Sequence, residues 1–284
     1  MKHLRAFLAC AALALAGCGE GDWPEPAPAL WRVTSPDGDK GWLLGTVHAL
    51  PDGVEWRTPL LDQAFADADL LVVEIADLDN TELSFPIFQR LAYSQGLPAL
   101  TMRVAGPDRA KVTALLQRAS GDEGDFAEME SWAAAMVLAG GVRLGDPANG
   151  VDQQLLAAGK PVVGLESFAS QLAIFDQLPD AEQQDLLLAV AQEAAVDDPR
   201  AGLEAWLVGD LAALEALGGE GLLADPELRA ALLDGRNRAW IDRVAALVDG
   251  GEQPFVAVGA AHMLGDAGLP ALLAARGFTV ERLQ

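Results

Sequence analysis

Short apolar blocks lie at both ends of the chain, and the region between them has the three-to-four-residue apolar spacing of helices. Residues 29–36 and 41–47 are apolar-rich and flank Pro36-Asp37-Gly38-Asp39. An Asp-Gly pair between two such runs is typical of a β-hairpin. Four further blocks have the length and composition of strands: 68–75, 160–165, 254–259 and 278–283.

Helical spacing fills most of the remaining chain. The pattern predicts helices over 59–66, 81–95, 107–119, 126–139, about 151–158 and about 267–276, and a long helical stretch over about 168–249 with breaks near Pro179, Pro199, Gly218–Gly221 and Pro226. Strand and helix alternate at both ends of the chain. We therefore expect the α/β class: a mixed β-sheet with flanking helices, and a large helical insertion (about 106–249) between its N- and C-terminal portions.

The N-terminus has the layout of a bacterial lipoprotein signal. A basic start is followed by an uncharged stretch over residues 6–17, which is shorter than the roughly 20 residues of a membrane span. The next residues, Leu15-Ala16-Gly17-Cys18, resemble the lipobox, in which the cysteine accepts a diacylglycerol. An ordinary secretory signal with a chance cysteine is the alternative.

This layout predicts a signal peptide over 1–17, a lipidated Cys18 with a flexible tether over 18–28, and one domain over 29–284. We expect the protein in the bacterial cell envelope, anchored to a membrane by its lipid and facing the periplasm. The outer membrane is favoured because Gly19, and not the aspartate that retains enteric lipoproteins in the inner membrane, follows the cysteine.

Composition narrows the classes of function. The chain has 284 residues, of which 51% are hydrophobic, and its 42 acidic against 19 basic residues give a net charge of −23. This charge disfavours a nucleic-acid partner. Neither a Walker A nor a Rossmann glycine motif is present, which disfavours a nucleotide cofactor, and the Gly-x-Ser-x-Gly and His-Glu-x-x-His motifs are also missing. Of the two cysteines, Cys10 would leave with the signal, so we expect no disulfide.

The residues that point to chemistry are two histidines in matching frames. His48 and His262 each follow a predicted strand, and each stands three residues after a glycine, Gly45 and Gly259. Glycine allows the backbone to turn sharply and to approach a ligand closely. Because ligands of α/β sheets bind beyond the carboxyl ends of strands, the two histidines can converge on one ion.

Two glutamates occupy similar positions. Glu74 and Glu166 each end a predicted buried strand, where a carboxylate is unfavourable unless it is paired, hydrogen-bonded or metal-bound. Two imidazoles and a carboxylate form a common hydrolytic metal set, and a second carboxylate can accept the proton of the attacking water. A structural interpretation stays open for each residue. Asp152 is most simply a residue of a helix N-terminus, and Trp240 a core residue.

The order of these features resembles that of the TraB/GumN family, which includes the Tiki metalloproteases of animals. The resemblance rests on an early Gly-x-x-His, Ala-Asp-Leu-Leu-Val-Val-Glu, Gly-Val-Asp, Lys-Pro-Val-Val-Gly-Leu-Glu, Arg-Asn and a terminal Phe-Val-Ala-Val-Gly-Ala-Ala-His block. It implies an α/β fold similar to that of the erythromycin esterase and ChaN-like proteins. It also implies that His48, His262, Glu74, Arg236 and Asn237 occupy the family positions.

The main hypothesis is a peptidase that uses a divalent metal, manganese, cobalt or zinc, on a peptide or protein substrate. His48 and His262 would bind the ion, and Glu74 would be a third ligand or the general base. Glu166 would be a base or support the site. Arg236 would stabilise an oxyanion or hold a substrate carboxylate.

Further roles and alternatives complete the expectation. Asn237, which is unusual in mid-helix, would orient a neighbouring side chain, and Gly45 and Gly259 would give the substrate space. The alternatives are a non-enzymatic protein that sequesters a peptide or another ligand in the same cleft, and a haem- or iron-binding lipoprotein.

Overall fold

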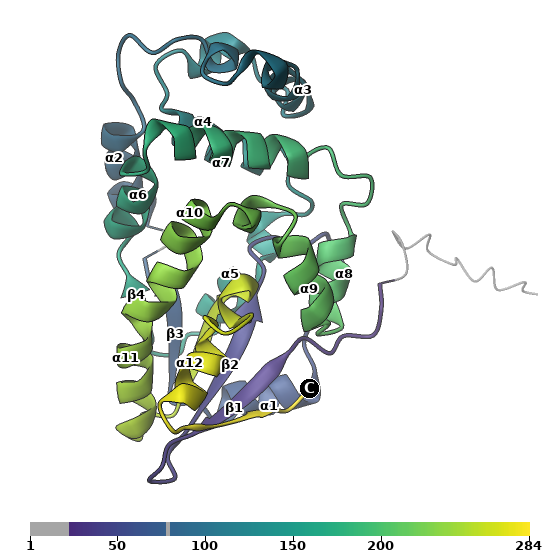
Figure 1. The fold of residues 1–284 in the computed structure, drawn as a ribbon. Coiled ribbons are helices and arrows are strands. Elements are labelled where there is room, and N and C mark those ends of the chain that lie inside the picture. The colour runs from purple at the N-terminus through teal and green to yellow at the C-terminus, as the bar shows by residue number, and fades with distance from the viewer. Residues whose placement is uncertain (1–22, 78–79) are drawn as a thin grey trace, which may run out of the picture.

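A six-stranded sheet forms the centre of the computed structural model, which describes residues 23–77 and 80–284. The strand order is β4-β3-β5-β2-β1-β6 (Figure 1). Strands β4, β3, β5 and β2 are parallel, whereas β1 and β6 are antiparallel additions at one edge. The strands are β1 (Leu30–Thr34), β2 (Lys40–Thr46), β3 (Leu70–Ile75), β4 (Val162–Glu166), β5 (Pro254–Gly259) and β6 (Thr279–Arg282). The predicted hairpin, mixed sheet and α/β class are confirmed. The predicted signal peptide and Cys18 lie outside the described residues.

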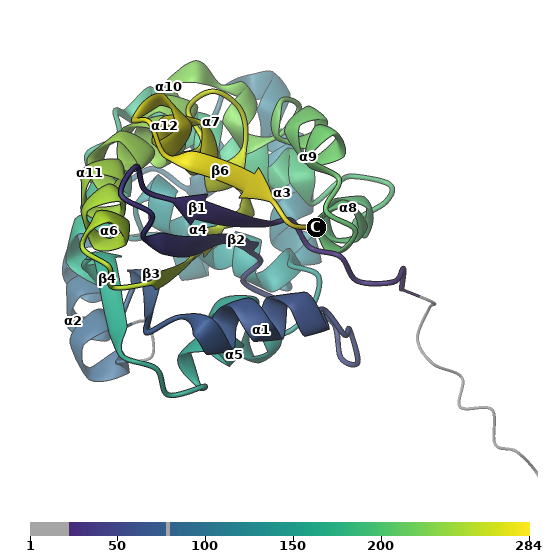
Figure 2. The same cartoon turned by 90° about the horizontal axis from the view of Figure 1, so that it is seen from below.

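Both faces of the sheet are buried under helices, as expected for parallel strands. Successive residues of one strand point to opposite faces, so Phe255 and Ala257 join one core and Val256 and Val258 the other. Helices α1 (Pro59–Asp67) and α5 (Val151–Leu156) lie on the first face, and α11 (Gly235–Asp249) and α12 (Leu269–Ala275) on the second (Figure 2).

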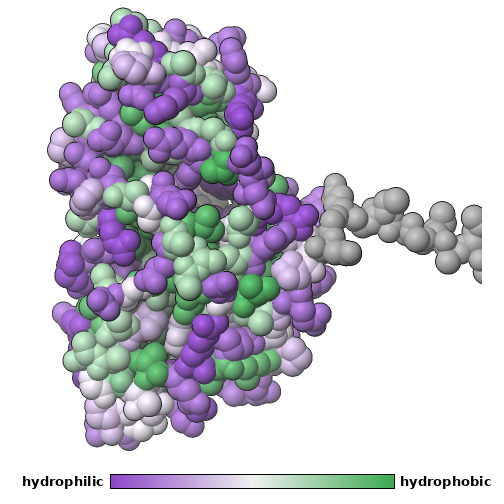
Figure 3. Space-filling model, turned by 45° about the vertical axis from the view of Figure 1, so that its right-hand side comes forward, coloured by the Kyte–Doolittle hydropathy of each residue, from purple (hydrophilic) through white to green (hydrophobic). Residues whose placement is uncertain are grey.

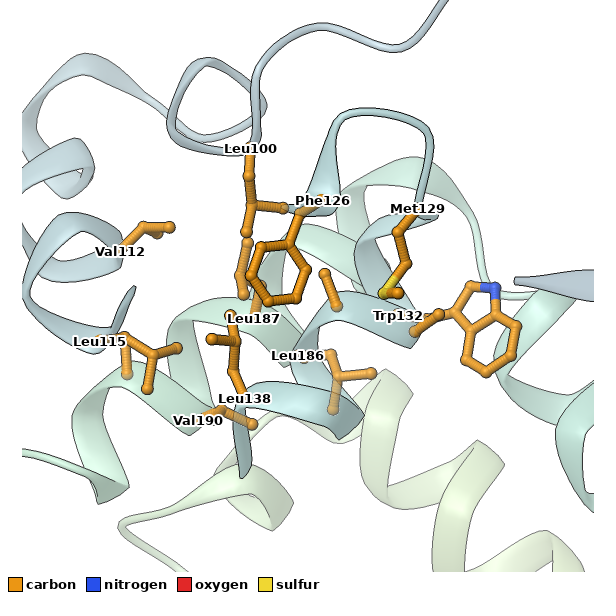
Figure 4. Close-up of a cluster of buried hydrophobic side chains, with 14 of the residues drawn as sticks. Leu100, Val112, Leu115, Phe126, Met129, Trp132, Leu138, Leu186, Leu187 and Val190 are labelled. Atoms are coloured by element: carbon orange, nitrogen blue, oxygen red, sulfur yellow. The ribbon is translucent and has the colours of Figure 1, made fainter. Parts of the chain in front are cut away.

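A separate layer of helices stands above the carboxyl ends of the parallel strands (Figure 1). Its own hydrophobic core includes Leu115, Trp132 and Leu187 (Figure 4). The surface is hollowed between this layer and the sheet-bearing part on the face shown in Figure 3. The remaining helices are α2 (Thr81–Leu91), α3 (Arg109–Arg118), α4 (Ser131–Val142), α6 (Phe168–Asp176), α7 (Asp180–Glu193), α8 (Ala201–Leu207), α9 (Leu211–Gly218) and α10 (Pro226–Arg229).

Two details of the predicted helical pattern differ from the structure. Helix α4 begins at Ser131 and not at residue 126, because the guanidinium of Arg103 binds the carbonyl groups of Phe126 and Met129 and holds the preceding segment as a turn. A π-helical turn at Ala230–Asp234 interrupts the long helical stretch directly before α11. Its wider hydrogen bonding has no signature in apolar spacing.

The described part of the predicted tether is packed on the domain. The guanidinium of Arg200 lies 4.0 Å from the ring centre of Trp23, and the Ala27 N–H donates to the carbonyl of Leu207 at 2.8 Å. Residues 23–28 therefore lie against helix α8 and are not a free linker. Within the described residues, no helix is both long and apolar enough to cross a bilayer.

The interior strand β5 is buried on both faces of the sheet. The Phe255 side chain is fully buried, and its ring meets that of Phe65 edge-on at 5.2 Å. We predict that Phe255→Ala lowers the free energy of unfolding by about 3–5 kcal/mol, measured by chemical denaturation. Phe85→Ala is the control, because Phe85 is 62% exposed. Equal stability of the two variants would contradict this assignment of the core.

Candidate functional site

The candidate site lies where four parallel strands end. Strand β2 ends at Thr46, β3 at Ile75, β4 at Glu166 and β5 at Gly259. These ends lie along one edge of the sheet, below the helical layer (Figure 1). All the catalytic and metal-binding residues predicted from the sequence stand at this edge or on α11 beside it.

Arg236 joins the two glutamates. Its Nη2 lies 2.5 Å from Oε2 of Glu74, and its Nε and Nη2 donate to the two oxygens of Glu166 at 3.0 and 3.2 Å. The three side chains are only 10–12% exposed. The Trp240 indole N–H donates to Glu166 at 2.8 Å, and its ring lies 4.6 Å from the guanidinium. Trp240 is thus a core residue, as predicted, that also contacts the site.

Glu74 stays ionised in this setting. Burial alone would raise its pKa, but the charges of His262, Arg236 and His48 and a hydrogen bond from the Gly259 N–H lower the pKa to about 2. Gln171 on α6 also donates to its Oε2 at 3.3 Å. Oε1 accepts the Gly259 N–H at 2.8 Å, so it still has a lone pair available.

His262 is held in one tautomer by Asn237. The Asn237 amide nitrogen donates to the carbonyl groups of Ala267 and His262, so its oxygen must accept, and it lies 2.7 Å from His262 Nδ1. The imidazole therefore carries its proton on Nδ1. Its Nε2 faces Nη1 of Arg236 at 3.3 Å and Oε1 of Glu74 at 3.8 Å. Burial, together with the charge of Arg236, lowers the His262 pKa to about 4 despite the negative Glu74.

His48 has the opposite environment. Its Nδ1 lies 2.7 Å from Oδ2 of Asp152, whose other oxygen accepts the Thr46 hydroxyl at 2.6 Å. The hydrogen bond to Asp152 raises the His48 pKa, outweighing burial, and the charges of Asp152 and Glu74 act in the same direction. The His48 side chain is 61% exposed, whereas that of Asp152 is only 10% exposed. Asp152 thus orients His48, and the His48 Nε2 lies beside Gly259.

The two glycines of the Gly-x-x-His frames have different roles. A Cβ on Gly259 would lie 3.2 Å from Glu74 Oε1 and 3.8 Å from His48 Nε2, so this glycine leaves space between the functional groups. A Cβ on Gly45 would lie 2.8 Å from the Cα of Ala260. Gly45 therefore lets strand β2 approach the turn that carries His262, and its contribution is to packing.

The structure brings the predicted residues together and changes the roles expected for Gly45 and Arg236. Every N–H direction of Arg236 is taken, because its Nη1 also donates to the carbonyl of Leu232 at 3.2 Å. Arg236 therefore organises the two carboxylates and has no donor left over for a substrate. Sequence reasoning missed the bond between Asp152 and His48 and that between Gln171 and Glu74. The Gly-Val-Asp motif drew attention to Asp152, whereas no sequence signal marked Gln171.

The possible metal-ligand atoms of His48, His262 and Glu74 do not all lie within 4.8 Å of one another. Among the described residues, the one set of three acidic or histidine side chains with ligand atoms all within 4.8 Å of one another is Glu182, Asp185 and Asp225, on α7 and before α10. Burial and neighbouring carboxylates raise the pKa of Glu182 and Asp185. The ligand atoms of the candidate site are therefore more widely spaced than those of this acidic group.

The shifted pKa of His262 predicts acid sensitivity. Between pH 6.5 and about 4 the unfolded chain protonates this imidazole while the folded chain does not, so folding stability falls as the pH decreases through this window. The expected loss is about 3 kcal/mol, measured by denaturation of chelator-treated protein. His262→Gln should remove this loss. His48→Gln is the control and should retain it, because the raised His48 pKa gives a dependence of opposite sign. An unchanged loss in His262→Gln would refute the assignment.

The chain is similar to known proteins in sequence. The chain is 28% identical over 261 residues to the uncharacterized protein YbaP of Shigella flexneri and to that of Escherichia coli (strain K12), covering 85% of this chain and 90% of each relative. No solved structure matches the chain. The sequence profile of the TraB/PrgY/gumN family matches residues 29–282 and so spans the sheet and every candidate site residue. The chain belongs to the TraB/PrgY/gumN family.

Proposed function

We propose that the protein is a divalent-metal-dependent hydrolase of peptide bonds, anchored to the bacterial cell envelope through lipid on Cys18. One observation carries the proposal. Two histidines from distant parts of the chain each have Nδ1 fixed by an acceptor. His48 Nε2 lies beside Gly259, and His262 Nε2 lies 3.8 Å from Glu74 Oε1.

The donor set fits a divalent cation in type and in charge. A metal-bound histidine usually donates its other N–H to a carboxylate or carbonyl oxygen, as His48 and His262 do to Asp152 and Asn237. The carboxylates of Glu74, Glu166 and Asp152 outnumber the single guanidinium of Arg236, which leaves two negative charges when both imidazoles are neutral. His48 Nε2, His262 Nε2 and Glu74 Oε1 would hold the ion, and His262 Nε2 would exchange its hydrogen bond from Arg236 Nη1 for the ion.

The remaining residues have separate tasks in this proposal. A bound ion would supply Lewis acidity, which lowers the pKa of a coordinated water. Asp152 holds the proton of His48 on Nδ1, so that the lone pair of Nε2 is available to the ion. Arg236 keeps Glu74 ionised and fixed beside Gly259.

The first test measures bound metal and hydrolysis together. Full-length protein, purified in detergent without chelator and supplied with manganese, cobalt or zinc, should bind about one ion by elemental analysis and cleave members of a peptide library. His48→Ala should lose at least about 100-fold in cleavage rate and bind less metal, with an unchanged melting temperature, because this side chain is exposed.

The control variant is Asp185→Asn, which alters the separate acidic group. It should leave both metal content and cleavage unchanged. Metal lost in Asp185→Asn and retained in His48→Ala would place the ion at the acidic group and refute the proposed site. Retained cleavage in His48→Ala would refute the role of this histidine, and a Soret band would indicate haem instead.

The two glycines give a second, matched test. Gly259→Ala should abolish cleavage while changing stability little, because the added methyl group meets side-chain atoms of the site. Gly45→Ala should lower the free energy of unfolding by about 1–3 kcal/mol, because its methyl group meets the Ala260 backbone. Activity assays and denaturation curves of both variants separate the two effects. An active Gly259→Ala protein would contradict the proposed location of the reaction.

A further inference from the structure

Helix α2 presents apolar side chains that the fold leaves uncovered. None of its residues is buried, and Phe85 and Leu83 are 62% and 57% exposed. Apolar residues kept exposed next to a polar site favour a binding role over a packing role. The helix follows strand β3, which carries Glu74, and packs against α6, which follows strand β4 and Glu166.

A pocket of about 470 Å³ opens between α2 and α6. Three phenylalanine rings supply its apolar surface, and hydroxyl and carboxylate groups supply its polar atoms. The lining residues are Thr81, Glu82, Ser84, Phe85, Phe88 and Phe168. The volume lies within the range of small-ligand sites and is large enough for an aromatic side chain.

The pocket adjoins the candidate site on the side opposite His48. Phe168 stands two residues after Glu166, and Gln171, one turn further along α6, donates to Glu74. Strands β4 and β3 lie on one side of β5, and β2, which leads to His48, lies on the other. A peptide bound along Glu74 and His48 would therefore reach the pocket at one of the two sides of the site.

We propose that this pocket binds one neutral apolar side chain, aromatic or branched aliphatic, of the peptide hydrolysed at the site. This inference rests on the proposed function. The aromatic lining selects an apolar group, and Glu82 disfavours an acidic one. A lipid surface is a less suitable occupant. Trp23, the first described residue after the predicted lipid anchor, is fixed at α8, on the other side of the molecule from α2 (Figures 1 and 2).

Binding and hydrolysis are tested separately. The binding probes are fluorescein-labelled Gly-Gly-Xaa-Gly-Gly peptides with Xaa as Phe, Leu, Ala or Asp, added to full-length His48→Ala protein in detergent and followed by fluorescence anisotropy. The Phe and Leu peptides should bind about tenfold more tightly than the Ala and Asp peptides. Adding Phe85→Ser should abolish this preference. Adding Leu83→Ser is the matched control, because Leu83 is exposed on the same helix but does not line the pocket.

The same substitutions are then made in protein with intact His48. Phe85→Ser should lower kcat/KM about tenfold for peptides with Phe or Leu and leave it unchanged for those with Ala. The absence of an apolar preference, or a preference that survives Phe85→Ser, overturns the inference. A preference lost in Phe85→Ser without hydrolysis of any peptide refutes the proposed peptidase while the apolar pocket stands.

Discussion

The buried group formed by Arg236, Glu74 and Glu166 is the constraint on which the site depends. Removing charges from water is unfavourable unless they are paired with good geometry, and each of these side chains is about 90% buried. The group therefore fixes helix α11 over the ends of strands β3 and β4. Because the Trp240 ring lies against both Arg236 and His262, the same contacts also position the second histidine.

This arrangement gives the two histidines different chemistry. His262 lies beside the guanidinium and is buried, so it is neutral over most of the pH range. His48 is exposed and bound to Asp152, which raises its pKa. One imidazole is thus buried and neutral, and the other is exposed and has a raised pKa. The shared Gly-x-x-His frame does not make the two interchangeable, because the side chain that meets each Nδ1 differs.

The two layers of the fold have different roles: one supports the site, and the other governs access to it. The sheet and its flanking helices hold the strand ends in register, while the helical layer has an independent core and stands above them. Helices α2 and α6 belong to this upper part, yet they follow directly from the strands that carry Glu74 and Glu166. Changes on the outer faces of these helices can therefore alter what reaches the site without altering the charged group beneath.

The sequence by itself determined the α/β class, most strands and helices, and the identity of the candidate residues, because apolar periodicity and strand-end motifs are local properties. The start of helix α4 at Ser131 depended on hydrogen bonds from Arg103, and the π-helical turn before α11 had no signature in apolar spacing. Only the tertiary structure decided that Arg236 is fully engaged and that Asp152 orients His48. Which charged side chains pair across strands and helices depends on which strand and helix ends the fold brings together. The spacing of residues along the sequence does not contain this information.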